Sequence, residues 1–252
     1  MMNTGLRKLG LLVATAALWF GAAAVLAPQM AAAKAPNIDP GSCGAGAGPI
    51  GDYCDFIDTG EDVVIAHGSC NVLFSCIVLG NGTRIGHDSC NAEAGCLAAG
   101  AWGGSSSIGN GSCNAVEACS SAGFLGGSST IGNASCNALN ACLNVGGFDA
   151  TSSSVIGNGS CNVEGACWGA GGGGKSRVNN NSCNGVSACV AAGANGGNST
   201  IGNSSCSALE ACELAGIDAT SVIGNHSCNL ANICVSDGIG GNTRVIGNNQ
   251  FN

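Results

Sequence analysis

Residues 108–123 read IGNGSCNAVEACSSAG, and this stretch recurs with small changes through most of the chain. Its framework is Ile108, then Ser112-Cys113-Asn114, then Cys119 and finally Gly123. Eight such units carry two cysteines separated by five residues, and their first cysteines follow one another at intervals of 20 to 25 residues. Self-similarity at a fixed period indicates a repeat architecture, in which each unit packs against its neighbours.

Several positions hold one residue type through the array. With the first cysteine of each unit as position 0, position −5 is Ile or Val, and position −1 is always Ser. Position +1 is Asn in seven units and Ser in one, and position +10 is always Gly. Insertions of variable length fall only after that Gly, as at Phe148-Asp149. One corner of each unit therefore tolerates extra residues, and the remainder does not.

This pattern predicts an all-β fold, a single-stranded parallel β-solenoid of about eight to nine coils of 20–25 residues. Neighbouring coils of a solenoid lie about 4.8 Å apart, so equivalent residues stack on one another. We expect the Ile column to fill the interior, and the Asn columns to form ladders along the axis. An α-solenoid is disfavoured, because Gly inside a helix costs about 1 kcal/mol per residue.

A period of about 22 residues with stacked Ile and Asn resembles the right-handed parallel β-helix of the pectate-lyase type, over residues 63–252 and in architecture only. The spacing of the cysteine pairs also resembles that of the much shorter coils of beetle antifreeze proteins. The Thr-x-Thr face of that second group is not found in this sequence. The first resemblance implies a right-handed coil, and neither implies a function.

We expect all 18 cysteines to form disulfides. The eight repeat pairs are predicted to close within their coils, linking two strands across the interior. Pairing between adjacent coils remains an alternative, because a spacing of about 4.8 Å also suits a disulfide. Metal binding is disfavoured, because zinc-binding cysteines are usually two to four residues apart. The repeat pairs are Cys70 with Cys76, Cys90 with Cys96, Cys113 with Cys119, Cys136 with Cys142, Cys161 with Cys167, Cys183 with Cys189, Cys206 with Cys212 and Cys228 with Cys234.

The N-terminal residues 1–33 are predicted to be a signal peptide of bacterial type. Arg7 and Lys8 precede an apolar run from Leu9 to Leu26, and a run of small residues ends at Ala33. A retained membrane anchor is the alternative; after cleavage no segment is long and apolar enough to span a membrane. We therefore expect a secreted protein, extracellular or at the cell surface, with the periplasm as a second option. Export also favours disulfides over free thiols.

The two ends of the repeat differ. Residues 34–62 are predicted to be an N-terminal cap, with Cys43 bonded to Cys54, outside the β-solenoid domain of residues 63–252. At the other end, Val245 and Ile246 begin a further coil that stops at Asn252. This last coil either presents a free pairing edge or is covered by its own final residues. The sequence leaves both alternatives open.

The polar residues form no pattern that we associate with catalysis. Equivalent charged residues sit several coils apart, at Arg84 and Arg177, Asp149 and Asp218, and Glu117 and Glu210. Paired glycosidase carboxylates must lie within about 10 Å of each other. His67 and His87 occupy a column that is otherwise mostly Asn, which favours a structural role; His226 lies one position further along. We therefore expect no enzyme, cofactor or metal site.

Charge excludes one class of partner. Lys and Arg number 7 against 15 Asp and Glu, which disfavours nucleic acid because its phosphates require clustered basic residues. The first hypothesis is a structural or cell-surface rod that self-associates through its coil ends. The second is a binding module that uses a flat solenoid face for a surface glycan or ice. An enzyme acting on polysaccharide is the third.

Overall fold

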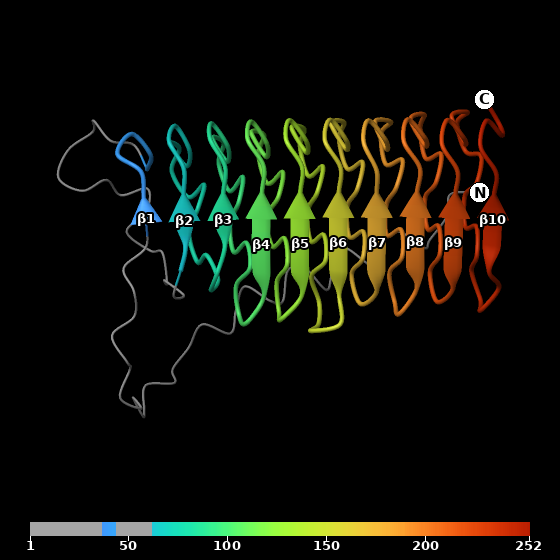
Figure 1. The fold of residues 1–252 in the computed structure, drawn as a ribbon, viewed down its shortest axis with the longest axis horizontal. Coiled ribbons are helices and arrows are strands. Elements are labelled where there is room, and N and C mark those ends of the chain that lie inside the picture. The colour runs from blue at the N-terminus through green and yellow to red at the C-terminus, as the bar shows by residue number, and fades with distance from the viewer. Residues whose placement is uncertain (1–36, 44–61) are drawn as a thin grey trace, which may run out of the picture. The chain divides into compact units, whose positions relative to one another are not determined.

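The computed structural model describes residues 37–43 and 62–252, which belong to one compact unit spanning Lys34–Asn252. The predicted signal peptide and the position of Cys54 lie outside the described residues. Ten parallel strands follow one another in sequence order to form one sheet, with one strand per coil (Figure 1). The parallel β-solenoid is therefore confirmed, and the resemblance to pectate-lyase-type helices is architectural. The strands are β1 (Asn37–Ile38), β2 (Val64–Ile65), β3 (Arg84–Ile85), β4 (Ser105–Ile108), β5 (Ser128–Ile131), β6 (Ser153–Ile156), β7 (Lys175–Val178), β8 (Asn198–Ile201), β9 (Thr220–Ile223) and β10 (Arg244–Ile246).

The predicted columns are the register of this sheet. Ile108 pairs with Ile131, Ile131 with Ile156, and Ile156 with Val178. The side chains of β4 to β9 alternate between the two faces of the sheet, and position −5 always faces the interior. Ile156 is only 1% exposed. A shift by one residue would turn the whole Ile column to solvent, so its burial holds the register.

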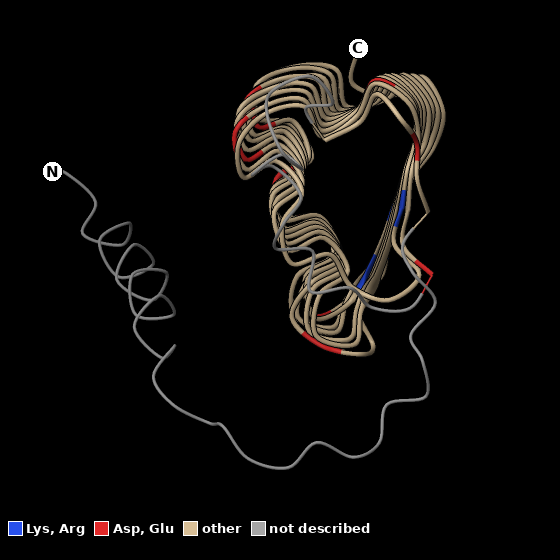
Figure 2. Ribbon diagram, turned by 90° about the vertical axis from the view of Figure 1, so that its left-hand side faces the viewer, with Lys and Arg blue, Asp and Glu red and all other residues tan. Residues whose placement is uncertain are grey.

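The rest of each coil is built from turns rather than a second sheet. Within the described residues only one sheet is present, and the limb from position +2 to position +10 consists largely of turns. Its amides still bond to the preceding coil, as Cys142 N does to Ala118 O at 2.7 Å and Asn144 N to Ser120 O at 3.0 Å. We call this limb the turn wall and the stacked strands the sheet wall. Figure 2 looks along the stack and shows the two walls on opposite sides of the interior.

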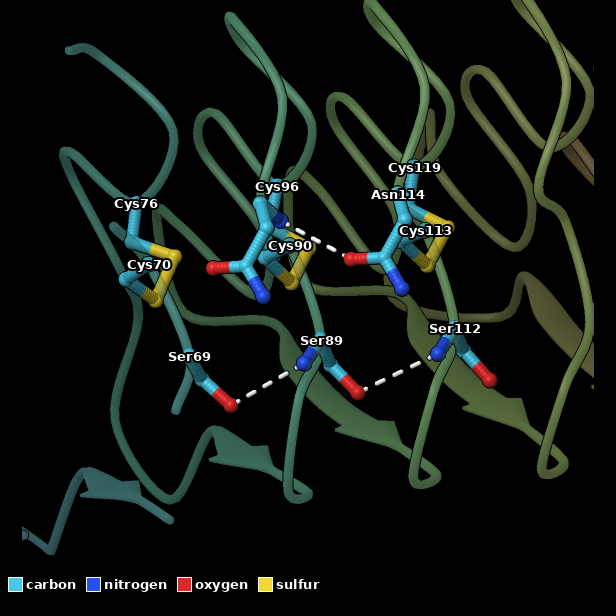
Figure 3. The surroundings of a disulfide bond; sticks show 12 residues. Ser69, Cys70, Cys76, Ser89, Cys90, Cys96, Ser112, Cys113, Asn114 and Cys119 are labelled. Carbon is cyan, nitrogen blue, oxygen red and sulfur yellow. Dashed lines mark hydrogen bonds between the residues drawn. A yellow bond between two sulfur atoms is a disulfide. The ribbon is translucent and has the colours of Figure 1, made fainter. Parts of the chain in front are cut away.

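All eight repeat pairs form disulfides within their own coils, which confirms the favoured pairing over bridges between adjacent coils. Figure 3 shows the bridges of Cys70, Cys90 and Cys113. In each bridge the two Cα atoms are separated by the distance usual for a disulfide, as at Cys136 and Cys142, where it is 5.6 Å. The bridges join Cys70 with Cys76, Cys90 with Cys96, Cys113 with Cys119, Cys136 with Cys142, Cys161 with Cys167, Cys183 with Cys189, Cys206 with Cys212 and Cys228 with Cys234.

The place of these bridges in the coil differs from the prediction. The expectation that they link two strands is wrong, because Cys136 lies in the corner after β5 and Cys142 lies in the turn wall. The same holds in every repeat unit, since the second cysteine always falls in a limb of turns. Cys136 and Cys142 are both fully buried. Each bridge therefore ties the corner to the middle of the turn wall.

Ser and Asn ladders connect the coils at this corner. The backbone N–H of Ser112 donates to Ser89 Oγ, and Ser112 Oγ in turn donates to a carbonyl of the next coil, Gly132 O, at 2.8 Å. Asn91 N–H donates to Asn114 Oδ1 at 3.0 Å, one of the ladder bonds in Figure 3. The predicted Asn ladders exist, but they join side chains to backbone rather than amide to amide. Each coil thus supplies the acceptors that its neighbour needs.

The interior also contains a row of serines at position −7, which face inward from the strands. Their hydroxyl oxygens have no hydrogen-bond partner within the described residues. An unsatisfied buried hydroxyl costs about 1 to 3 kcal/mol. The Ile column, the disulfides and the ladders must offset that cost. The row comprises Ser106, Ser129, Ser154, Ser176, Ser199 and Ser221.

Residues 37–43 repeat the architecture of the later coils. Ile38 pairs with Ile65, and Cys43 N–H donates to Ser69 O at 3.0 Å, as later first cysteines do to the next Ser. Ser42 Oγ donates to Ala66 O. The sequence interpretation placed Cys43 outside the repeat, and the structure corrects this. Cys43 is disulfide-bonded, and that residues 34–62 serve as a cap stays a prediction.

Candidate functional site

The residues that we considered for catalysis stay apart in the structure. Glu117 and Glu210 both lie on the turn wall at position +4, and four coils separate them, which is about 19 Å. Asp149 and Asp218 lie in variable corners of different coils. Within the described ranges, no group of three or more His, Cys, Asp or Glu side chains could hold a metal ion. That the protein is not an enzyme stays a prediction.

Asp149 organises its own loop. Its Oδ1 accepts hydrogen bonds from the hydroxyl and the backbone N–H of Thr151, at 2.7 and 2.8 Å. Ser152 adds two more bonds to the same oxygen. Several hydrogen bonds lower the pKa of Asp149, and the bond donated by the Thr151 hydroxyl has the largest effect. The carboxylate therefore shapes the longest described corner, which is a structural task.

His67 links the first described segment to the next coil. Its Nδ1 lies 3.0 Å from Pro40 O and 3.2 Å from Asp39 Oδ1. The bond to the Pro40 carbonyl, followed by the contact with Asp39, raises the pKa of His67 above its usual value. His87 keeps its place in the Asn column, where its backbone N–H donates to Asn110 Oδ1. Both histidines thus contribute to stacking, as predicted from their column.

Aromatic side chains occupy the variable corner of three consecutive coils, and the first two are in contact. Trp102 is 61% exposed and its ring centroid lies 5.0 Å from that of Phe124. Phe148, from the next coil, is also exposed, and Gly172 leaves room for its ring. A Cβ at Gly172 would lie 2.5 Å from that ring. The sequence interpretation missed this patch because the corner varies in length and its residues do not align as a column.

The outer row of the sheet wall is mixed in character. At position −6 it presents Ser107, Thr130 and Val155, which are interrupted by the exposed side chains of Arg84 and Arg177. The C-terminal end is marked by β10, the last strand of the described sheet, whose Val245 is 70% exposed. The face of β10 that points away from β9 has no strand beside it within the described residues.

The residues after β10 continue a coil in register. Cys228 N–H donates to Gln250 O, and Asn229 N–H donates to Phe251 O. Gln250 and Phe251 stand where earlier coils have Ser and the first Cys, and Phe251 shares the positive φ of that cysteine. The described residues after β10 therefore continue the stack in register with the preceding coil.

The disulfide content fits an oxidising, extracellular location. Within residues 37–43 and 62–252, the structure contains no helix with the length and hydrophobicity of a membrane span. Comparison with known proteins adds no identity: no family model, no curated protein and no solved structure matches this chain. The candidate function therefore depends on the walls, the corner and the edge of β10 described above.

Proposed function

We propose that this protein is a non-catalytic structural component of the cell exterior, a rigid rod that stacks end to end. The observation that carries the proposal is the sheet of ten strands in one uninterrupted register, in which β10 has no strand beside its far edge within the described residues. Unpaired edge strands are templates for a further chain. A head-to-tail contact between identical copies does not close on itself, so it produces a filament.

The repeated coil supports a mechanical role. Each coil is bonded to the next through the strands, the Ser and Asn ladders and the turn wall, and each repeat unit carries its own disulfide. Such a coil has few segments that a protease could open, because local unfolding must break bonds to both neighbours. A rod of this kind resists bending and digestion, which are properties that a surface layer or filament needs.

Electron microscopy of the oxidised, processed protein at increasing concentration tests end-to-end stacking. We expect filaments one solenoid wide. Val245→Pro, which places a residue without a backbone N–H in the edge strand, should raise the concentration needed for filaments, while Val245→Thr, which keeps the strand, should not. Discrete rods of about 45 Å, the length of ten coils, at every concentration would contradict the proposal.

A second candidate function is binding of a surface glycan at the variable corner. The specific observation is the contact of Trp102 with Phe124 and the exposed Phe148 at the same corner of the next coil, because aromatic faces are common contact surfaces for apolar faces of ligands. Co-sedimentation with insoluble cellulose, chitin and xylan tests it. We expect Trp102→Ala with Phe148→Ala to abolish retention, and Phe74→Ala, which removes an exposed aromatic elsewhere, to have no effect. Equal retention of the wild type, the double variant and Phe74→Ala would contradict a site at this corner.

A further inference from the structure

The basic residues and the glutamates of the repeat domain lie on different walls, whereas Asp88, Asp149 and Asp218 lie at the corners. All the Lys and Arg residues in the described part of the chain lie on strands of the sheet wall, whereas every described Glu lies on the turn wall. Figure 2 shows the basic residues confined to one side of the stack. The basic set is Arg84, Lys175, Arg177 and Arg244, and the acidic set is Glu93, Glu117, Glu164, Glu210 and Glu213.

Most of these charges have no partner of opposite sign among the described residues. Arg244 pairs with Asp237 at 3.2 Å. Among the described residues, no ion pair involves Arg84, Lys175, Arg177 or any glutamate. Glu213 lies near Glu210, and burial together with that like charge raises the pKa of Glu213. The turn wall thus holds carboxylates whose mutual repulsion a cation from outside would relieve.

The two sets of charges have the same spacing along the axis. Arg84 and Arg177 stand at position −6 of coils four apart, and Glu117 and Glu210 stand at position +4 of coils four apart. Each spacing is about 19 Å. The glutamates are displaced from the arginines by one coil. A second copy that is shifted by one coil and faces its turn wall to this sheet wall therefore aligns both pairs at once.

The same arrangement also brings a pair of neighbouring basic residues opposite a pair of neighbouring glutamates. Lys175 lies two residues before Arg177 on β7, and Glu213 lies three residues after Glu210 on the turn wall. Opposite walls of one coil run in opposite directions. In two copies with the same orientation, Arg177 therefore meets Glu210 at one height, and Lys175 meets Glu213 at the other. The single charges, Arg84 and Glu117, meet four coils away.

The turn wall also carries an apolar ridge along its length, at position +3. Its side chains are between 41% and 46% exposed, which is high for large apolar residues on a regular wall. The ridge would face the Ser, Thr and Val side chains at position −6 of the other copy. It consists of Leu73, Val116, Leu139, Val186 and Leu209, interrupted by Glu93 and Glu164. In the staggered arrangement those two glutamates face Val64 and Thr130, so they remain in contact with uncharged residues.

We propose that copies of this protein associate side by side and in parallel, the sheet wall of one against the turn wall of the next with a stagger of one coil. The contact joins different surfaces and does not close, so it generates a ribbon or layer. It deepens the structural role proposed above by naming a second copy as the lateral partner. It does not require the edge of β10.

Charge reversal with rescue tests the pairing. We expect the wild-type protein to form ribbons at low ionic strength and to separate into single rods or filaments at about 1 M salt, where charges are screened. Lys175→Glu with Arg177→Glu should raise the concentration needed for ribbons about tenfold or more, as should Glu210→Lys with Glu213→Lys, because each places like charges opposite one another. A 1:1 mixture of the two variants restores opposite charges at the contact and should restore ribbons.

The control has the same change of charge on the turn wall. Glu93→Lys with Glu164→Lys alters residues that face no charge in the staggered arrangement, and ribbons should form as in the wild type. Equal circular dichroism spectra and melting temperatures show that all variants fold. Carbodiimide coupling of isotope-labelled and unlabelled copies should yield an intermolecular Lys175–Glu213 cross-link.

The outcomes distinguish the lateral contact from end-to-end stacking. Single-width wild-type filaments at low salt would overturn the lateral contact and leave end stacking in place. Ribbons of short rods would support the lateral contact without end stacking. Failure of the mixed variants to form ribbons, or loss of ribbons in the control, would overturn this pairing.

Discussion

The sheet wall and the turn wall solve the same stacking problem with different backbones. On the sheet wall, residues alternate between the two faces and an Ile fills the interior in every central coil except that of Val178. On the turn wall, positions +4 and +8 adopt positive φ even where the residue is not Gly, as at Asn140 (54°) and Ala191 (53°). Left-handed backbone costs most residues about 1 to 2 kcal/mol. The sheet wall is thus favoured by its own residues, whereas the turn wall needs cross-links and ladders to hold it.

Reduction of the disulfides should break the turn wall and have the largest effect. Each short loop contributes about 2 kcal/mol by chain entropy, so eight together exceed the stability of about 5 to 15 kcal/mol that is usual for a domain. We expect the reduced protein to be unfolded at 25 °C, as measured by circular dichroism with a thiol assay. A reduced protein that melts within a few degrees of the oxidised one would show that the turn wall stands without cross-links.

Truncation of the Ile column should break the sheet wall at one coil. Ile156 is buried between Ile131 and Val178, so Ile156→Ala should cost about 2 to 5 kcal/mol of unfolding free energy. Val155→Ala, on the outward face of the same strand, should cost less than about 1 kcal/mol. Urea denaturation measures both. Similar losses for the two variants would mean that the interior column does not hold the register.

Substitutions to glycine should change the free energy of unfolding in opposite directions on the two walls. At Ala191, Gly relieves the positive φ, and we expect Ala191→Gly to stabilise the protein by up to about 1 kcal/mol. Ser107→Gly places the same residue in an extended strand, where it should destabilise by about 1 kcal/mol. The difference in urea midpoint between the variants gives the comparison directly. A loss at both positions would indicate that the turn wall carries no strain at Ala191.

The smallest effect should be a pH-dependent loosening of residues 37–43. Because the pKa of His67 is raised above 6.5 in the folded state, its stabilising contribution is complete below pH 6.5 and is lost as the pH rises through the raised value. Hydrogen exchange of the Asn37, Asp39 and Cys43 amides, expressed as protection factors, measures this. His67→Asn should remove the pH dependence, and an unchanged dependence in that variant would assign it to another group.

The sequence was sufficient to predict the columns and part of what they do. The period, the buried Ile column and the pairing of cysteines within coils were predicted from identical residues recurring at identical positions, and the structure confirms them. These contacts can be predicted from the sequence because each coil packs against a neighbour of nearly the same sequence. The Asn ladders were predicted as amide-to-amide contacts and are side-chain-to-backbone bonds, and the Ser ladder was not predicted. The segment containing Ile38 and Cys43 was missed because its later cysteine does not follow after five residues.

Sequence alone therefore determined the repeat, its interior and its cross-links, since these follow from which residue types recur. Only the tertiary structure decided that the second limb is a wall of turns, because its left-handed positions hold Asn, Glu, Ala and Leu rather than a recurring Gly. It also decided that the basic residues and the glutamates lie on opposite walls of the coil. Which wall a charge occupies depends on how each coil closes in space, and spacing along the chain does not contain that information.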